Sequence, residues 1–448
     1  MSLTSFQVNM ISLLFMLALI SLIYFKDKDK FEREGVFLLR RTDKGIDWIN
    51  DFAEKHKKLV ESFGYFSVSF SLGFLSSFKV YRDKKKWLIY NSISFLMMLI
   101  AFKEFSGLNS SSLAYLLVWC FSGLVGQSFF YLLKKAYKII HPVGKIIPAL
   151  QLVLPFEAKK APIFYVPLPY WIISIAVILI VHEFAHAIVA RARGVKIKSV
   201  GYGFLLFLPL GFAEPDEEEL KKKSKETRMM VYGAGSLSNI MFAVFFFALF
   251  LGTSLLVAKM YVPTGVQYQK TMNGTYAFKN LPESGVITQI NGKPVKDLND
   301  LIKIMRGLKP GENITLVVNS KKYWVVLVHN PENKSLPLIG IYGVSIKFSV
   351  KKDVKKILGT KIPEFFIYTA NLFKFLFIIN LGVGFANLLP LLPFDGGLIL
   401  KDLFEAELSE KKKIKEYLKS LRFIIFALIQ TIVVILILIN LLAPYIKL

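Results

Sequence analysis

Cysteine and histidine are scarce in this chain, and their scarcity limits the chemistry that it can hold. There is one cysteine, Cys120, in 448 residues, so neither an intramolecular disulfide nor a cysteine-rich metal site is expected. Only five histidines are present. A bound metal would therefore have to use histidine and carboxylate ligands.

Acidic residues are also few. The chain has 32 Asp and Glu against 57 Lys and Arg, which gives a net charge of +25. In a soluble protein this excess would suggest nucleic acid, but no basic stripe is interleaved with aromatic residues, so we expect no nucleic-acid partner. Basic residues gather instead in segments between apolar runs, as in cytoplasmic loops beside anionic lipid.

Apolar runs dominate what is present. Hydrophobic residues make up 54% of the chain and the mean hydropathy is +0.48. Several runs approach the roughly 20 residues that a helix needs to cross a bilayer. They are 8–25, 87–102, 113–133, 170–190, 241–257, 365–389 and 423–442, with two ambiguous segments at 63–78 and 139–156. The predicted fold class is a polytopic α-helical membrane protein embedded in a lipid bilayer.

Composition divides the chain into four parts. Residues 1–160 are predicted to be an N-terminal membrane region of several helices, and 161–258 to hold two membrane helices around an extended segment. Residues 259–350 are more polar and predict a small soluble α+β insert. Residues 351–448 return to the membrane with two helices. Within the insert, strands are expected at 286–290, 314–318 and 323–328 and a helix at 298–305.

The run VHEFAH lies inside an apolar segment and contains His182, Glu183 and His186. Residues four apart share one face of a helix, so both imidazoles can point at one metal ion. Glu183 can take a proton from the attacking water, as the general base of a metalloprotease does. Polar groups within a membrane helix are costly, which favours a functional role over a merely polar helix end.

A catalytic zinc usually has three protein ligands, so the two histidines need a partner. His56 and His141 lie in basic loops, and His329 ends a strand of the insert. Asp395 is the better candidate, because it ends a membrane helix that two prolines break in the run NLLPLLPFDGG. The alternative is a helix-ending Asp-Gly turn without a ligand.

The two motifs together resemble the site-2 protease family of intramembrane metalloproteases. The family pattern combines HExxH with an Asn-x-x-Pro…Asp-Gly motif, which fits Asn387 and Asp395. A third family element, Gly-x-x-x-Asn, is similar to Gly235–Asn239, with Ser236 where the family usually has proline. Leu392 likewise stands where a second proline is common. The resemblance covers roughly residues 165–445.

The resemblance implies a role for each matching residue. His182, His186 and Asp395 would bind one zinc ion, with Glu183 as the catalytic base and later the proton donor. Asn387 and Asn239 would bind the substrate backbone or steady the oxyanion. The implied activity is that of a metalloendopeptidase that cuts transmembrane segments of other membrane proteins, as in regulated intramembrane proteolysis. Its partners would be those transmembrane substrates.

The insert resembles a PDZ-like domain through GVITQINGKPVKDLNDLIKIM, and in the family such domains lie between the second and third core helices. The alternative is a small structural β domain. The predicted architecture is therefore a helical metalloprotease core with an inserted PDZ-like domain.

The run VGYGFLLFLPLGF at 200–212 is apolar, but its glycines and proline argue against a helix. In the family, the corresponding chain enters the membrane in extended form. Its exposed edge could pair with an unwound substrate, or it could be an interfacial hairpin without a substrate role. The acidic residues that follow, at 214–219, are contiguous and expected to be solvated rather than a metal site.

Basic clusters set the expected orientation. Clusters at 191–198, 221–228 and 411–422 belong on the cytoplasmic side, which puts the insert outside. His186 lies about 7–8 Å along the helix from Arg191, and His182 about 6 Å deeper, at 1.5 Å per residue. We expect a multi-pass protein of the cell membrane whose active site lies in the bilayer, nearer the cytoplasmic face.

Two other functions fit parts of the pattern. An ion or solute transporter could use intramembrane His, Glu and Asp, but neither an inverted repeat nor a second broken helix in a matching position is visible. A non-catalytic PDZ-bearing scaffold would not need intact ligands and Glu183. The sequence leaves open the substrate, the oligomeric state, the helix count in residues 1–160 and any need for prior substrate cleavage.

Overall fold

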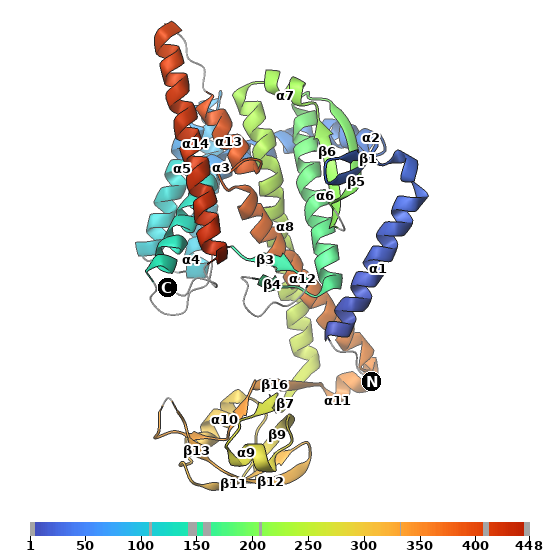
Figure 1. The fold of residues 1–448 in the computed structure, drawn as a ribbon, viewed down its shortest axis with the longest axis vertical. Helices are drawn as coiled ribbons and strands as arrows, with labels where there is room; N and C mark the ends of the chain where they lie inside the picture. Colours follow the sequence, from blue (N-terminus) through green and yellow to red (C-terminus); the bar gives the residue numbers. More distant parts are fainter. Residues whose placement is uncertain are drawn as a thin grey trace. The chain divides into compact units, whose positions relative to one another are not determined.

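The computed structural model describes residues 5–106, 110–141, 150–155, 163–205, 208–331, 333–405 and 412–442 (Figure 1). The chain divides into two compact units: Met1–Ala248 with Leu372–Leu448, and Leu249–Asn371. Residues 142–149 and 156 of the ambiguous segment 139–156 lie outside the described residues, as does Lys411 of the last basic cluster.

Among the described residues, five helices carry stretches that are long and apolar enough to cross a membrane: Ser111–Ile140, Leu168–Ala192, Lys225–Met260, Lys361–Asn387 and Ser420–Leu442. They belong to α5 (Ser110–Ile140), α6 (Leu168–Ala192), α8 (Lys225–Met260), α12 (Lys361–Asn387) and α14 (Lys412–Leu442). The prediction of a helical membrane protein is confirmed at this level.

Two other predicted runs also form helices. Residues 8–25 lie in α1 (Ser5–Lys26). Within this helix, Leu13–Lys26 is an apolar stretch that is shorter than the five spans. Residues 87–102 lie in α4 (Lys84–Ser106), which is not among the five spans. The apolar centre of α4 lies between Lys86 and Lys103 and is short for a span of about 20 residues.

The ambiguous segment 63–78 is helical, in α3 (Lys57–Ser77), which follows α2 (Ile46–Lys55). Helix α3 is broken at Gly73, with φ 68°, and α5 is broken at Gly123, with φ 61°. A Cβ at either glycine would strike backbone of the other helix, at the Trp119 and Ser71 carbonyl groups respectively. The structure thus contains broken helices that the sequence did not reveal, in α3 and α5.

A four-stranded sheet forms beside α6, in the order β1 (Glu32–Glu34), β2 (Phe37–Thr42), β5 (Ile197–Leu205), β6 (Leu208–Pro215). The described part of 200–212 is extended, as predicted, while residues 206–207 lie outside the description. Strand β5 pairs with β2 on one side and with β6 on the other. The strand edge that remains in this segment therefore belongs to β6, not to β5.

Short elements complete the first unit. After the sheet, Asp216 caps α7 (Glu217–Lys222) by accepting hydrogen bonds from the amides of Glu218 and Glu219, so the acidic run has a structural explanation. The parallel strands β3 (Leu152–Leu154) and β4 (Ile163–Tyr165) precede α6, and a 3₁₀ turn covers Lys28–Lys30.

The link between α12 and α13 (Asp395–Phe404) corrects the predicted end of the broken helix. Helix α12 ends at Asn387, before both prolines, and Asp395 begins the next helix instead of ending this one. Residues that precede proline avoid the helical region, and a carboxylate at a helix start is favoured by the helix dipole.

Side chains of other helices form hydrogen bonds with the backbone of this link. Gln430 of α14 accepts from the Leu392 amide at 2.8 Å and donates to the Pro390 carbonyl at 2.7 Å. Ser128 of α5 donates to the Leu388 carbonyl at 3.0 Å.

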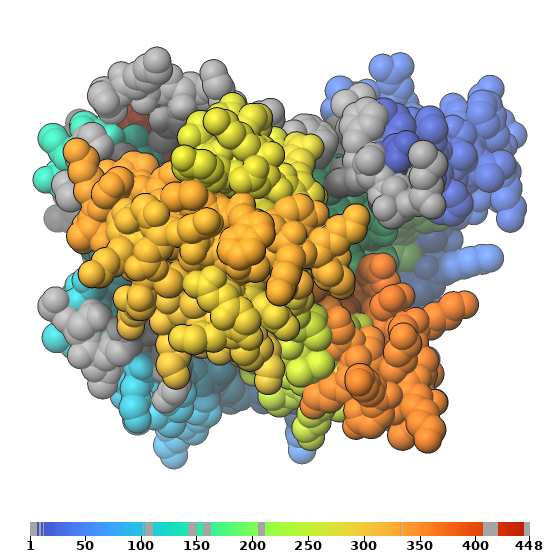
Figure 2. All heavy atoms as spheres, turned by 90° about the horizontal axis from the view of Figure 1, so that it is seen from below, coloured from blue at the N-terminus to red at the C-terminus, as the bar shows by residue number. Residues whose placement is uncertain are grey.

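The second unit contains a small α+β fold, whose surface appears in yellow to orange in Figure 2. Its main sheet runs in the order β12 (Lys321–Val326), β11 (Asn313–Val318), β9 (Gly285–Ile290), β7 (Tyr261–Tyr268), β16 (Ser345–Val350), and β10 (Lys293–Pro294) pairs with β9. Helix α10 (Leu298–Met305) packs Leu301, Ile304 and Met305 against its core.

Most of the predicted elements of this unit are confirmed. The last predicted strand, 323–328, is divided between β12 and β13 (Val328–His329), and α9 (Tyr276–Asn280), capped by Thr275, was missed. The remaining elements are short: β8 (Lys270–Thr271), β14 (Pro337–Leu338), β15 (Ile341–Tyr342) and α11 (Lys352–Leu358).

Candidate metal centre

Helix α6 presents both histidines of the HExxH run. It starts after Pro167 with a proline in its first turn, where the missing amide hydrogen costs nothing, and it ends at Ala192. His182 and His186 are four residues apart, and their Nε2 atoms lie 3.2 Å from each other. The predicted sharing of one helix face is therefore seen directly.

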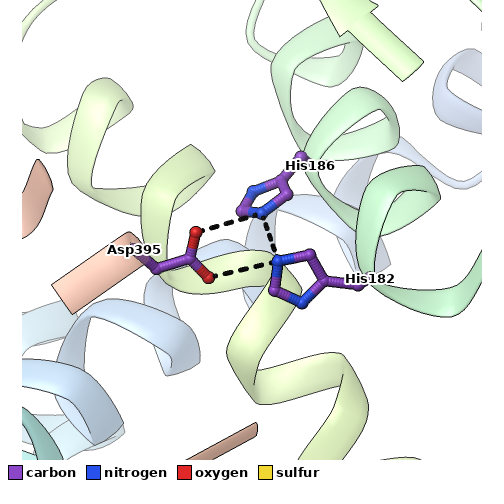
Figure 3. Close-up of side chains that lie close together, drawn as sticks. All are labelled: His182, His186 and Asp395. Carbon is purple, nitrogen blue, oxygen red and sulfur yellow. Dashed lines mark hydrogen bonds and ion pairs between the residues drawn. The ribbon is translucent and has the colours of Figure 1, made fainter. Parts of the chain in front are cut away.

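Asp395 meets the two imidazoles from the start of α13 (Figure 3). Its Oδ2 lies 3.5 Å from His182 Nε2 and its Oδ1 lies 3.3 Å from His186 Nε2. The three side chains are only 10%, 14% and 9% exposed, in the order His182, His186, Asp395. The fold thus brings Asp395 to a pair of histidines that lies more than two hundred positions earlier in the sequence.

The spacing of these atoms fits a tetrahedral zinc site. Zinc bonds to histidine nitrogen and carboxylate oxygen are about 2.0–2.2 Å long, so ligand atoms at two corners of a tetrahedron lie about 3.3 Å apart. The three separations here are 3.2, 3.3 and 3.5 Å. Two imidazoles and one carboxylate also match the ligand types of catalytic zinc, with one corner left for water or substrate.

Helix α8 supplies a hydrogen-bond partner to each of the three residues. His186 Nδ1 donates to the Val231 carbonyl at 2.7 Å, which leaves Nε2 free to bind a metal. Ser236 Oγ donates to Asp395 Oδ2 at 2.7 Å. The Asn239 carboxamide lies 3.1 Å from His182 Nδ1.

The contact of Asn239 with His182 bears on the tautomer of that imidazole. A neutral histidine that binds metal through Nε2 carries its proton on Nδ1 and needs an acceptor there. Among the described residues, the buried Asn239 Oδ1 has no hydrogen-bond partner. Turning the carboxamide by 180° brings this oxygen to His182 Nδ1, where it can accept the proton of the imidazole. The structure therefore fits metal-binding tautomers at both histidines.

The other candidate residues do not belong to this cluster. Glu183 is half-buried on α6, between the two histidines in sequence. Asn387 is half-buried at the last position of α12. Asn239 is fully buried against His182. That Asn239 or Asn387 binds the backbone of a substrate stays a prediction. His56, His141 and His329 are not members of the cluster.

The fold and these distances agree with what sequence comparison finds. The model of "Peptidase family M50" matches residues 170–432 of this chain. The chain belongs to peptidase family M50. Members of M50, the site-2 protease family, are zinc metalloproteases, and the matched residues include His182, Glu183, His186 and Asp395. The resemblance to this family is thereby confirmed.

One relative of this M50 chain is an uncharacterized protein of Methanocaldococcus jannaschii. The two are 28% identical over 267 residues, which is 58% of this chain and 65% of the archaeal protein. The match thus spans less than two thirds of the relative's length. Because this relative is uncharacterized, the family membership rests on the family model alone.

Three contributors to the M50 centre were missed by the sequence-based prediction. Ser236 was noted only as a departure from the family pattern, Gly235 only as part of a motif, and Val231 not at all. Spacing was the available signal: positions 231, 235 and 239 recur every four residues, and 236 lies beside them, so all four share one side of α8.

Proposed function

We propose that this protein is an intramembrane zinc endopeptidase that cleaves transmembrane segments of other membrane proteins. The observation that carries this proposal is the convergence of His182, His186 and Asp395 from α6 and α13, at separations that suit tetrahedral zinc. Helix α6 is itself one of the apolar helices long enough to span a membrane. Family membership supports the same conclusion.

In the proposed reaction, each residue of the site has its own role in peptide hydrolysis. When bound, zinc supplies the Lewis acidity that polarises a peptide carbonyl and activates water. His182, His186 and Asp395 would hold the ion. Glu183 takes the proton from the attacking water and passes it to the leaving amine, so that no free charge is released into the membrane interior. Asn387 is the proposed contact for the substrate backbone.

Strand β6 offers a way to present an unwound substrate. A peptide bond within a helix is shielded by its neighbours, so the cleaved segment must become extended. Strand β6 is the edge of its sheet, and it packs along α6, where a Cβ on Gly211 would lie 4.0 Å from Leu179 Cβ. Leu179 is one helical turn before His182. We propose that substrate adds to this edge as a further strand.

Orientation and the role of the second unit are parts of the same proposal. The basic clusters favour a zinc site nearer the cytoplasmic face of the cell membrane, with the α+β insert outside. The sheet and α10 of this insert are compatible with a PDZ-like domain that selects substrates.

The test is a Glu183→Gln variant of the full-length chain, purified in detergent. Glutamine keeps the size of glutamate but cannot accept the proton, so cleavage of a transmembrane substrate should fall by about 100-fold or more. Zinc content, measured by atomic emission, should stay near one ion per chain. His182→Ala should lose both zinc and cleavage. Wild-type cleavage rates in Glu183→Gln would contradict the proposal.

A transporter is the second candidate, since α3 and α5 are broken helices like those of ion-binding sites. Their packing argues against it. Each break is filled by the backbone of the other helix, because a Cβ at Gly73 or Gly123 would overlap a carbonyl group there. Ion flux into vesicles that disappears in His182→Ala, without any peptidase activity, would favour the transporter.

A further inference from the structure

We infer that Ser236 is a positioning residue of the metal centre, whose hydroxyl holds the Asp395 carboxylate against the two histidines. This inference rests on the proposed zinc site. Ser236 Oγ donates a 2.7 Å hydrogen bond to Asp395 Oδ2. Ser236 and Asp395 are both buried, so water does not compete strongly for this contact.

The direction of this hydrogen bond is unusual for a serine within a helix. Such a hydroxyl commonly returns to a carbonyl three or four residues earlier on its own helix. Ser238, two residues away on α8, does this by donating to the Gly235 carbonyl at 2.7 Å, and its other contact is the Val181 backbone carbonyl of α6 at 3.1 Å. Ser236 instead reaches a carboxylate 159 residues away in sequence. The contact therefore ties α8 to α13 at the metal centre itself.

The backbone at Ser236 has little freedom to move. Gly384 of α12 packs against it so closely that a Cβ at position 384 would lie 3.1 Å from the Ser236 carbonyl oxygen. On its other side, Gly235 lies under the two imidazoles. Because the backbone of Ser236 is held in this way, its hydroxyl restricts the rotation of the Asp395 carboxylate.

The chemistry of the contact favours metal binding. A hydroxyl that donates to a carboxylate stabilises the ionised form, which is the form that coordinates metal. It also occupies one lone pair of Oδ2 and so limits how the two oxygens can turn. Hydrogen bonds of this kind to metal ligands typically change metal affinity by about 10–100-fold. Proline, the residue that the family usually has here, could not donate this bond.

The experiment compares zinc affinities of the purified full-length chain and its variants in detergent, by competition with a chromophoric chelator. Ser236→Ala should raise the zinc dissociation constant about tenfold or more. The melting temperature of the metal-free protein should stay near that of the wild type. Ser238→Ala is the matched control and should leave the zinc dissociation constant unchanged, because Ser238 does not contact a ligand.

Cobalt substitution supplies a second readout that a purely structural role would not move. The d–d absorption bands of bound Co²⁺ report ligand geometry, so Ser236→Ala should shift them as Asp395 turns. Ser236→Thr keeps the hydroxyl and should restore most of the zinc affinity and the wild-type bands. If Ser236→Ala matches the wild type in both zinc affinity and cobalt spectrum, the inference about Ser236 is wrong.

A further variant separates this failure from failure of the proposed site. Asp395→Ala removes the carboxylate itself and should abolish tight zinc binding. If Asp395→Ala weakens zinc binding while Ser236→Ala does not, only the inference about Ser236 falls. If Asp395→Ala binds zinc as tightly as the wild type, the proposed metal site fails and the inference fails with it.

Discussion

The space around position 235 leaves no room for a side chain, so this residue must be glycine. A Cβ at this position would overlap His186 Nε2 and would lie 2.7 Å from His182 Nε2. The backbone of α8 therefore passes directly under the two nitrogens that converge on the proposed zinc site. Any side chain here would compete with the imidazoles for the same volume.

We expect Gly235→Ala to weaken zinc binding without weakening the helix. Alanine favours a helix by about 1 kcal/mol over glycine, so the metal-free protein should unfold at an unchanged or higher temperature. The added methyl group should turn the imidazoles away and raise the zinc dissociation constant at least about tenfold. Chelator competition and thermal unfolding would measure the two effects.

Gly252→Ala, on the same helix, is the control for this substitution. Nothing lies within 4 Å of a Cβ built at Gly252, so zinc affinity should be that of the wild type. Wild-type zinc affinity in Gly235→Ala as well would show that the imidazoles can move at no cost, against our expectation.

Some residues of the candidate site could be predicted from the sequence, and others could not. The pairing of His182 with His186 follows from helical spacing alone, and their nitrogens do meet. Asp395 was chosen because a carboxylate follows a broken apolar helix, and it does join them. Ser236 and Ser238 look alike in sequence, and only the packing of α8 against α13 decides which one reaches Asp395.

At the scale of elements, the four-stranded sheet depends on a charged cluster around Arg41. The guanidinium contacts Glu32 at 2.6 Å, Glu34 at 2.7 Å and Glu214 at 3.3 Å. These contacts join β1, β2 and β6 around β5. The Ser199 hydroxyl and Arg41 both bind the charged form of Glu214, which lowers the pKa of its carboxyl below the usual value.

This cluster predicts that the hairpin β1–β2 opens more readily in acid. A carboxyl whose pKa is lowered by folding stabilises the fold above its unfolded pKa of 4.5, and the effect is lost as the pH falls through the lower, folded value. Hydrogen exchange of residues 32–42, corrected for intrinsic rates, should therefore accelerate as the pH falls from 7 to below 4.

Substituting the arginine should have the same effect at neutral pH. Exposed ion pairs each contribute about 0.2–1 kcal/mol, so Arg41→Ala should speed exchange in the hairpin by roughly fivefold for about 1 kcal/mol. Arg33→Ala is the control, because Arg33 donates to the Gly35 carbonyl at an exposed position. Equal exchange rates in all three proteins would mean that the cluster does not hold the hairpin.

Element boundaries were predictable where local rules decide them. Helix α10 spans the predicted 298–305, since Asp297 caps it and its apolar residues recur at helical spacing. The breaks at Gly73 and Gly123 were not predictable, because glycine is tolerated inside membrane helices. They form where two backbones cross, and this crossing is a property of the tertiary fold.

At the scale of the whole molecule, the N-terminal region is part of the same unit as the metal centre although the family match begins only at residue 170. Ser67 donates to the Met230 carbonyl of α8 at 3.1 Å, and a Cβ on Gly64 would press against the Met230 side chain. Ser128 supports the link that precedes Asp395. The N-terminal helices therefore contact α8 and the link before α13, two segments that build the site.

Glu226 makes this dependence testable. It is 4% exposed on α8 and accepts hydrogen bonds from the Tyr65 hydroxyl at 3.1 Å and the Arg82 amide at 2.7 Å, both from the N-terminal region. Arg193 is its nearest cation, at 3.6 Å. A hydrogen bond to a charged group contributes about 1.5–3 kcal/mol, so losing two of them removes a large part of the stability of an ordinary domain.

We therefore expect residues 161–448, produced alone, to aggregate or to purify without zinc. Production together with residues 1–160 as a separate chain should restore both a co-purifying pair and zinc content, because the contacts around Glu226 and Met230 need proximity and not a continuous backbone. Affinity purification through a tag on one chain, followed by zinc analysis, gives the measurement. Residues 161–448 that are folded and zinc-loaded by themselves would show that the N-terminal region is dispensable to the site.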